Sequence, residues 1–342
     1  MRRNRRAIVR TSVALAVAMV AAGAWGAAPA QDPTSWAVSA GVSYRVVPDL
    51  TYLTAGGHES KLDLIVPRDT TAPAPLLVYI HGGGWVQGSK ESSDLALLPW
   101  LEQGWAVANV EYRLGPVALA PAAVEDCRCA LRFLRDNATT YKIDPARIVV
   151  TGHSAGGHLS LTTGMLVAAA GFDNLCPKRN TNPAAGGFAD AVVEEMPVAA
   201  IVNWFGITDV SDLLAGANAK AYAVQWMGSL PDREELALRL SPITMVRSTL
   251  PPILTIHGDA DPIVPYQHAV RLHEALTAAS VENQLHTVPG GGHGNFTVEQ
   301  MLEAYRVIRE FVAKHVGTAP GVVGTTPSAA LDTGAEDGAP AS

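Results

Sequence analysis

The stretch Gly152-His153-Ser154-Ala155-Gly156 constrains this 342-residue chain more than any other. It follows the apolar, β-branched run 147–151, which predicts a buried strand, and it precedes a segment rich in alanine and leucine, which predicts a helix. A serine flanked by glycines at a strand-to-helix junction is typical of a sharp turn in which larger neighbours would clash. The start of a helix also favours negative charge. The pattern therefore predicts that Ser154 is a nucleophile.

A second glycine-rich loop, His81-Gly82-Gly83-Gly84-Trp85, directly follows the apolar run 76–80. Consecutive glycines leave backbone N–H groups uncovered by side chains. Such a loop supplies one half of an oxyanion hole, and the N–H after the nucleophile supplies the other half. The expected donors are the N–H groups of Gly83, Gly84 and Ala155, and His81 is expected to brace the loop. No phosphate-binding pattern follows, which argues against a nucleotide site.

Two later loops carry an acid and a base. Asp259 and Asp261 follow the strand-like run 252–256, and His293 lies among glycines after the expected strand 284–288. Either aspartate could orient an imidazole, although Asp259 also suits the capping of a local turn. The chain order serine, aspartate, histidine is that of α/β-hydrolases and differs from that of chymotrypsin-like and subtilisin-like enzymes. Together the loops predict a Ser-His-Asp triad.

Strands and helices alternate along residues 31–316, which predicts one α/β domain. Expected strands are at 43–47, 61–66, 76–80, 106–112, 147–151, 198–204, 252–256 and 284–288, with clear helices at 124–134 and from residue 298. This rhythm predicts a mostly parallel, doubly wound sheet with helices on both faces and a site at the strand carboxyl ends. The alternation of strands and helices is interrupted at 207–248, where short helical fragments are expected at 219–226 and 234–240. This segment either forms a small cap over the site or packs its aromatic side chains on the core. Trp85 and Asp209 are candidate pocket residues.

The first 30 residues have the features of a secretory signal peptide. Five arginines precede the apolar run 13–22, and Ala28-Pro29-Ala30 suits cleavage before Gln31. The paired Arg5-Arg6 leaves both Sec and twin-arginine export open. With 20 basic and 32 acidic side chains remaining, the cleaved chain would carry a formal net charge of −12. We therefore expect a periplasmic or extracellular protein with no nucleic-acid partner and no stable membrane anchor. A disordered tail is expected at 317–342, where large apolar residues are scarce.

An exported chain with three cysteines can form one disulfide. Cys127 and Cys129 lie two residues apart on an expected helix, so their side chains point in nearly opposite directions and cannot pair with each other. One of them is expected to bridge Cys176. Cys129 is favoured because it lies off the apolar stripe of that helix.

The four motifs H-G-G-G-W, G-H-S-A-G-G-H-L, H-G-D-A-D-P-I-V-P and G-G-H-G resemble those of bacterial carboxylesterases in the α/β-hydrolase superfamily. The resemblance covers roughly residues 43–316 and is greatest to the feruloyl/acetyl-xylan-esterase-like group, which is related to the hormone-sensitive-lipase-like esterases. It implies that Asp261 is the triad acid and that plant-polysaccharide-linked esters are candidate substrates. The scarcity of large aromatics and the small cap favour short or medium acyl chains. The expected chemistry needs no metal and no organic cofactor.

Three other functions fit parts of the sequence. The segment 257–265 is similar to one in prolyl-oligopeptidase-like peptidases, but that group usually carries a large N-terminal domain. An aryl-formamidase shares a similar H-G-G loop, but the export signal argues against that metabolic role. A binding-only α/β-hydrolase fold is disfavoured because every catalytic position holds the required residue type. Carboxylic ester hydrolysis is the expected activity.

Overall fold

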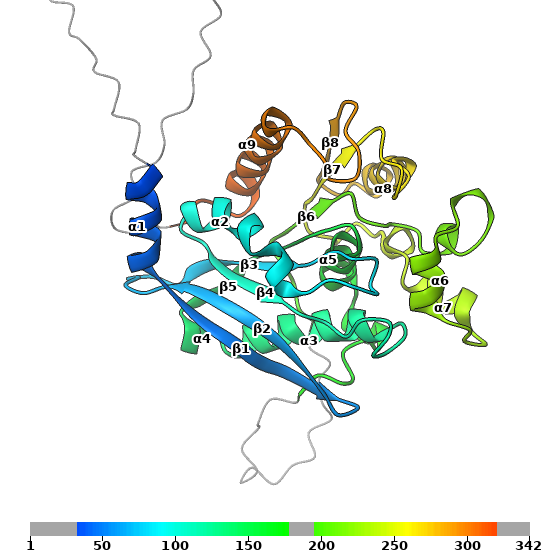
Figure 1. The fold of residues 1–342 in the computed structure, drawn as a ribbon, viewed down its shortest axis with the longest axis horizontal. Coiled ribbons are helices and arrows are strands. Elements are labelled where there is room, and N and C mark those ends of the chain that lie inside the picture. The colour runs from blue at the N-terminus through cyan, green and yellow to red at the C-terminus, as the bar shows by residue number, and fades with distance from the viewer. Residues whose placement is uncertain (1–32, 178–194, 320–342) are drawn as a thin grey trace, which may run out of the picture. The chain divides into compact units, whose positions relative to one another are not determined.

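Runs of apolar and β-branched residues form eight strands in the computed structural model, which describes residues 33–177 and 195–319. The strands are β1 (Tyr44–Ala55), β2 (His58–Pro67), β3 (Ala74–Ile80), β4 (Ala106–Val110), β5 (Ile143–His153), β6 (Ala200–Trp204), β7 (Ile253–Gly258) and β8 (Asn283–Val288). They form one sheet in the order β1-β2-β4-β3-β5-β6-β7-β8 (Figure 1). The pairs β1–β2 and β2–β4 are antiparallel, and the other five pairs are parallel. The predicted mostly parallel sheet is confirmed.

Side chains that alternate along the strands build a core on each face of the sheet. In β3, Leu77 and Tyr79 join one core, whereas Val78 and Ile80 join the other. The first core is covered by α2 (Leu98–Glu102) and α9 (Val298–His315), and the second by α3 (Ala122–Asp136), α5 (Ala155–Met165) and α8 (Gln267–Ala278). The predicted placement of helices on both faces is confirmed. Two further helices, α1 (Pro33–Ser43) and α4 (Ala138–Tyr141), precede β1 and β5.

The segment between β6 and β7 contains α6 (Ala221–Met227), α7 (Arg233–Arg239) and three 3₁₀ turns. Its helices lie where the sequence predicts helical fragments. Trp226 and Met227 are fully buried, and the Trp226 ring stacks on Trp85 with centroids 4.2 Å apart and planes inclined by 15°. Tyr222 is half-buried. The large side chains of α6 thus pack mainly on the core, as expected if this segment contributes aromatic packing and does not form a cap.

A disulfide joins Cys129 in α3 to Cys176, which lies beyond the end of α5. Cys127 is a buried free thiol. The favoured pairing is confirmed, but Cys129 is fully buried in the same core as Cys127 and does not lie off the apolar face of the helix. Burial raises the pKa of the Cys127 thiol, which keeps that group uncharged and unreactive.

The predicted signal peptide at residues 1–30 lies outside the described part of the chain, as does most of the predicted tail, 320–342. Within residues 33–177 and 195–319, every helix is too short or too polar to span a bilayer.

Candidate active site

Ser154 occupies the sharp turn between β5 and α5. Its φ of 57° and ψ of −117° are rarely adopted by a residue with a side chain, and backbone strain of this kind clusters at functional sites. Contacts on both sides hold the turn. The Ser154 N–H donates to the Trp204 carbonyl at 2.9 Å, and a Cβ atom at Gly156 would lie 2.1 Å from the Ile80 carbonyl oxygen. The glycine that the pattern demanded is therefore a steric requirement of the turn.

The 81–85 loop lies directly beside Ser154. A Cβ atom added at Gly82 would lie 3.6 Å from the Ser154 Cβ, and Gly83 and Gly84 have φ values of 114° and 60°, which favour glycine. In the described part of the chain, no backbone or side-chain acceptor receives a hydrogen bond from the N–H groups of Gly83, Gly84 or Ala155. These are the three donors expected from the sequence, and they are free to bind an oxygen of a ligand.

Asp261 and His293, the acid and the base expected from the sequence, are in contact. The His293 Nδ1 lies 2.7 Å from Asp261 Oδ2, while Asp261 Oδ1 accepts the N–H groups of Ile263 and Val264 at 2.8 and 3.0 Å. Burial opposes ionisation of this carboxyl, but hydrogen bonds from His257, His293 and the backbone outweigh it, so the pKa of Asp261 lies well below its ordinary value. The ionised carboxylate therefore holds the proton of His293 on Nδ1.

Asp259 has a local role. Its Oδ1 accepts the Gly290 N–H at 2.7 Å, which ties the loop after β7 to the loop that carries His293. The structure brings only Asp261 into contact with the imidazole, and Asp259 caps a turn.

Phe205 brings the histidine loop to the serine turn. The centroid of its ring lies 4.7 Å from that of the His293 ring and 5.5 Å from that of His153, the residue before Ser154. Burial, together with the nearby charge of His293, lowers the pKa of His153 to about 4. The loops that follow β3, β5, β7 and β8 thus meet at the carboxyl edge of the sheet.

An open cavity of about 440 Å³ adjoins this meeting point, and its lining includes Tyr79, Gly82, His153, Phe205 and residues 91–96. The Tyr79 hydroxyl is hydrogen-bonded to His153 Nδ1. Because burial raises the pKa of Tyr79, its hydroxyl is protonated and donates, so the uncharged His153 ring carries its own proton on Nε2.

Two carboxylates, those of Glu91 and Asp94, also line this cavity. Asp94 accepts a hydrogen bond from Asn109 Nδ2 at 3.0 Å, and Glu91 lies three residues earlier. Burial and the neighbouring charges of Asp63 and Glu91 raise the pKa of Asp94. The cavity lining therefore includes hydroxyl, imidazole and carboxylate groups that can form hydrogen bonds with a ligand.

The two candidate pocket residues have other roles. Trp85 is fully buried and its indole N–H donates to His158 Nδ1 at 3.1 Å, so the expectation that it lines the pocket is corrected: it anchors the 81–85 loop on the core. The Asp209 carboxylate pairs with Arg271 at 3.1 Å and ties the segment after β6 to α8. The sequence did not identify Tyr79, whose position at the end of β3 is the only signal that could have indicated it.

Across the described ranges, no cluster of three or more histidine, cysteine or acidic side chains is placed to hold a metal ion.

The sheet, the serine turn and the order of the loops define an α/β-hydrolase fold. Residues 62–276 match the BD-FAE family, and the chain belongs to that family. The truncated form of a carbohydrate esterase from gut microbiota is structurally similar, with a TM-score of 0.64, 29% sequence identity, and coverage of 79% of this chain and 98% of that one. A structure of Thermogutta terrifontis esterase 2, at 22% identity and a TM-score of 0.64, covers 82% of this chain and 97% of its own, and shares the fold.

Among curated proteins, esterase LipC of Mycobacterium tuberculosis is 30% identical over 230 residues, which cover 66% of this chain and 54% of LipC. A probable isoprenylcysteine alpha-carbonyl methylesterase of Oryza sativa, ICMEL1, is 26% identical over 72% of this chain and 57% of its own length. The chain thus spans a little over half the length of these two curated relatives.

Proposed function

We propose that this protein is a serine esterase that hydrolyses carboxylic esters through an acyl-enzyme. One observation carries the proposal: a strained serine lies beside three backbone N–H groups that have no partner within the described residues, and the Phe205 ring joins this serine turn to a histidine held by an ionised aspartate. The names of the relatives, which include esterases LipC and LipQ of Mycobacterium tuberculosis and a carbohydrate esterase from gut microbiota, support it.

In the proposed reaction, His293 removes the Ser154 proton as the hydroxyl attacks the ester carbonyl. Asp261 holds the imidazole in the required tautomer and stabilises its cation. The N–H groups of Gly83, Gly84 and Ala155 bind the tetrahedral oxyanion, and loss of one such donor costs about 3–4 kcal/mol. The alcohol leaves with the proton from His293, and water then hydrolyses the acyl-enzyme by the same route.

The test of this proposal is turnover of p-nitrophenyl acetate together with labelling by a fluorophosphonate. We expect one label per chain, located on Ser154 by peptide mass spectrometry, with activity lost in proportion. An unlabelled chain without turnover would indicate a binding protein with an esterase fold. Faster cleavage of a peptide or formamide substrate than of any ester would favour the amide hydrolases to which the sequence is also similar.

The proposed substrates are esters of short or medium acyl chains, including those linked to plant polysaccharides. We assign the cavity beside Phe205 to the alcohol half of the ester, because His293, which must protonate the leaving alcohol, contacts that ring. The donors and carboxylates of its walls suit a hydroxylated alcohol. The printed name of the similar structure, a carbohydrate esterase, agrees with this assignment.

Replacement of Asp94 by alanine is expected to lower kcat/KM about fivefold on acetylated xylo-oligosaccharides, the size of one lost hydrogen bond. Activity on p-nitrophenyl acetate should stay within about twofold, because its aromatic leaving group offers no hydroxyl to the carboxylate. The matched control is Asp69→Ala, an exposed carboxylate outside the cavity. Equal losses on both substrates would refute the assigned alcohol site.

We also propose that the protein is exported. The arginine-rich start and apolar run of residues 1–30 support this, as does the Cys129–Cys176 disulfide, since disulfides persist mainly in oxidising compartments. N-terminal sequencing of the mature protein should begin at Gln31, and an intact Met1 would contradict export by cleavage.

A further inference from the structure

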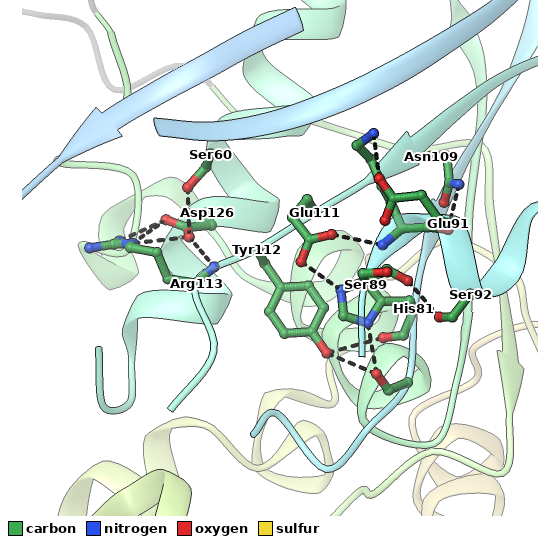
Figure 2. Close-up of polar contacts among 12 residues, drawn as sticks. Ser60, His81, Ser89, Glu91, Ser92, Asn109, Glu111, Tyr112, Arg113 and Asp126 are labelled. Atoms are coloured by element: carbon green, nitrogen blue, oxygen red, sulfur yellow. Dashed lines mark hydrogen bonds and ion pairs between the residues drawn. The ribbon is translucent and has the colours of Figure 1, made fainter. Parts of the chain in front are cut away.

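A fully buried histidine lies at the base of the 81–85 loop. His81 Nδ1 lies 2.7 Å from the Gly82 carbonyl oxygen, and His81 Nε2 lies 3.3 Å from Glu111 Oε1, just beyond the end of β4. Figure 2 shows the ring between Glu111 and the loop. Both ring nitrogens therefore face oxygen atoms.

The carboxylate favours a second proton on the ring. A neutral imidazole carries one N–H, whereas a carbonyl and a carboxylate are both acceptors. If that N–H is on Nδ1, where it binds the Gly82 carbonyl, the Glu111 carboxylate lies 3.3 Å from an unprotonated Nε2 that makes no hydrogen bond within the described residues. A second proton on Nε2 turns this contact into an ion pair, which stabilises the N–H on Nδ1 as well.

Other contacts fix the ring and the carboxylate. The Tyr112 ring stacks on His81 with centroids 4.3 Å apart, and its hydroxyl donates to the His81 carbonyl at 3.1 Å (Figure 2). Glu111 Oε2 accepts a hydrogen bond from the backbone N–H of Lys90 at 2.7 Å. A Cβ atom at Gly88 would lie 2.8 Å from the Gly82 carbonyl oxygen, so the backbone at Gly88 also packs closely against this carbonyl.

Glu111 is the charged group that faces the ring. Burial raises the pKa of Tyr112 and of the neighbouring Tyr52 and Cys127 well above their ordinary values, so all three stay uncharged. The Lys90 ammonium is held by carboxylates, among them Asp63 at 2.8 Å.

The Gly82 carbonyl and the Gly83 N–H belong to one planar trans peptide, in which they point in opposite directions. A donor that holds the carbonyl therefore also sets the direction of the N–H. We propose that Glu111 and His81 are positioning residues: Glu111 keeps a proton on both sides of the His81 ring, and His81 Nδ1–H holds the Gly82 carbonyl so that the Gly83 N–H points at the oxyanion. This inference rests on the proposed esterase function.

Glu111→Leu tests the inference. It removes the carboxylate beside His81 Nε2 and frees the ring to lose its Nδ1 proton. The Gly82 carbonyl then keeps only its longer, 3.4 Å hydrogen bond from the Tyr112 hydroxyl, so the peptide between Gly82 and Gly83 is held less firmly. We expect kcat on p-nitrophenyl acetate to fall about tenfold to a hundredfold, with KM within about twofold, because an oxyanion donor acts in the transition state. An unchanged kcat, or a change confined to KM, would overturn the inference.

Glu111→Gln should recover most of the kcat lost in Glu111→Leu. Its amide oxygen can accept the Lys90 N–H while its NH₂ group donates to Nε2 of a neutral His81 ring, which keeps the Nδ1 proton on the Gly82 carbonyl. A Gln variant as slow as the Leu variant would contradict the role.

Asp173→Asn is the matched control for stability. It breaks a buried ion pair with Arg128, 2.6 Å long, on the α3 side of the sheet. It should lower Tm as Glu111→Leu does while leaving kcat near the wild-type value. An equal loss of kcat in this control would show that the loss in Glu111→Leu comes from general destabilisation, and it would overturn the proposal. Fluorophosphonate labelling of the wild type tests the esterase function separately, because it does not depend on Glu111.

Discussion

Ser154→Ala is expected to lower kcat on p-nitrophenyl acetate about 10³-fold or more while the protein folds normally. The substitution removes the atom that forms the acyl-enzyme. The unpaired N–H groups of the 81–85 loop remain, so the residual rate should still exceed that of the uncatalysed reaction. The turn itself should persist, because the backbone bond from residue 154 to the Trp204 carbonyl does not involve the side chain.

Ser160→Ala is the matched control for this prediction. Ser160 is a buried serine of the same helix, and its hydroxyl donates to the Gly157 carbonyl at 2.8 Å. Its loss should change Tm but not kcat. Circular dichroism and thermal unfolding would establish that both variants fold. Retention of more than about a tenth of the activity in Ser154→Ala would exclude this serine as the nucleophile.

Asp261→Asn should reduce kcat by about 10³- to 10⁴-fold, the loss expected when a triad carboxylate becomes an amide. The amide carries no negative charge, so it cannot stabilise the His293 cation that forms during the reaction. It can also donate to Nδ1, which selects the wrong tautomer of the ring. The low pKa of Asp261 shows that the protein stabilises the charged form, which is the form that asparagine removes.

Asp259→Asn provides the comparison within the same loop. Its Oδ1 can still accept the Gly290 N–H, so kcat should stay within about threefold of the wild type. A larger loss in Asp259→Asn than in Asp261→Asn would reverse the two roles and contradict the contact between Asp261 and His293.

Local patterns predicted most of the fold. Apolar runs of strand length indicated the strands, and the spacing of apolar residues from Val298 indicated α9. The 3₁₀ turns after β6 were not predicted, because short turns have little periodicity and their geometry depends on what they pack against. α1 was also missed, since it lies at the start of the described chain, where the sequence shows a weak amphipathic pattern.

The site was predicted only in part. The nucleophile turn and the glycine loop could be recognised because each is a local steric requirement. Trp85 could not be placed correctly, since its burial depends on Trp226, which comes 141 positions later in the chain. Glu111 gave no signal as a partner of His81, because it lies inside the expected strand 106–112 and 30 positions away from His81 in the chain.

Local sequence patterns are enough to locate the strands, the serine turn and the residue types available for catalysis, because short-range sterics and periodicity depend on neighbouring residues. The folded chain is needed to learn which aspartate contacts His293, which cysteine bonds to Cys176 and which acid lies beside His81. Those choices depend on distances between loops far apart in the chain, and these distances are set by the packing of helices on both faces of the sheet.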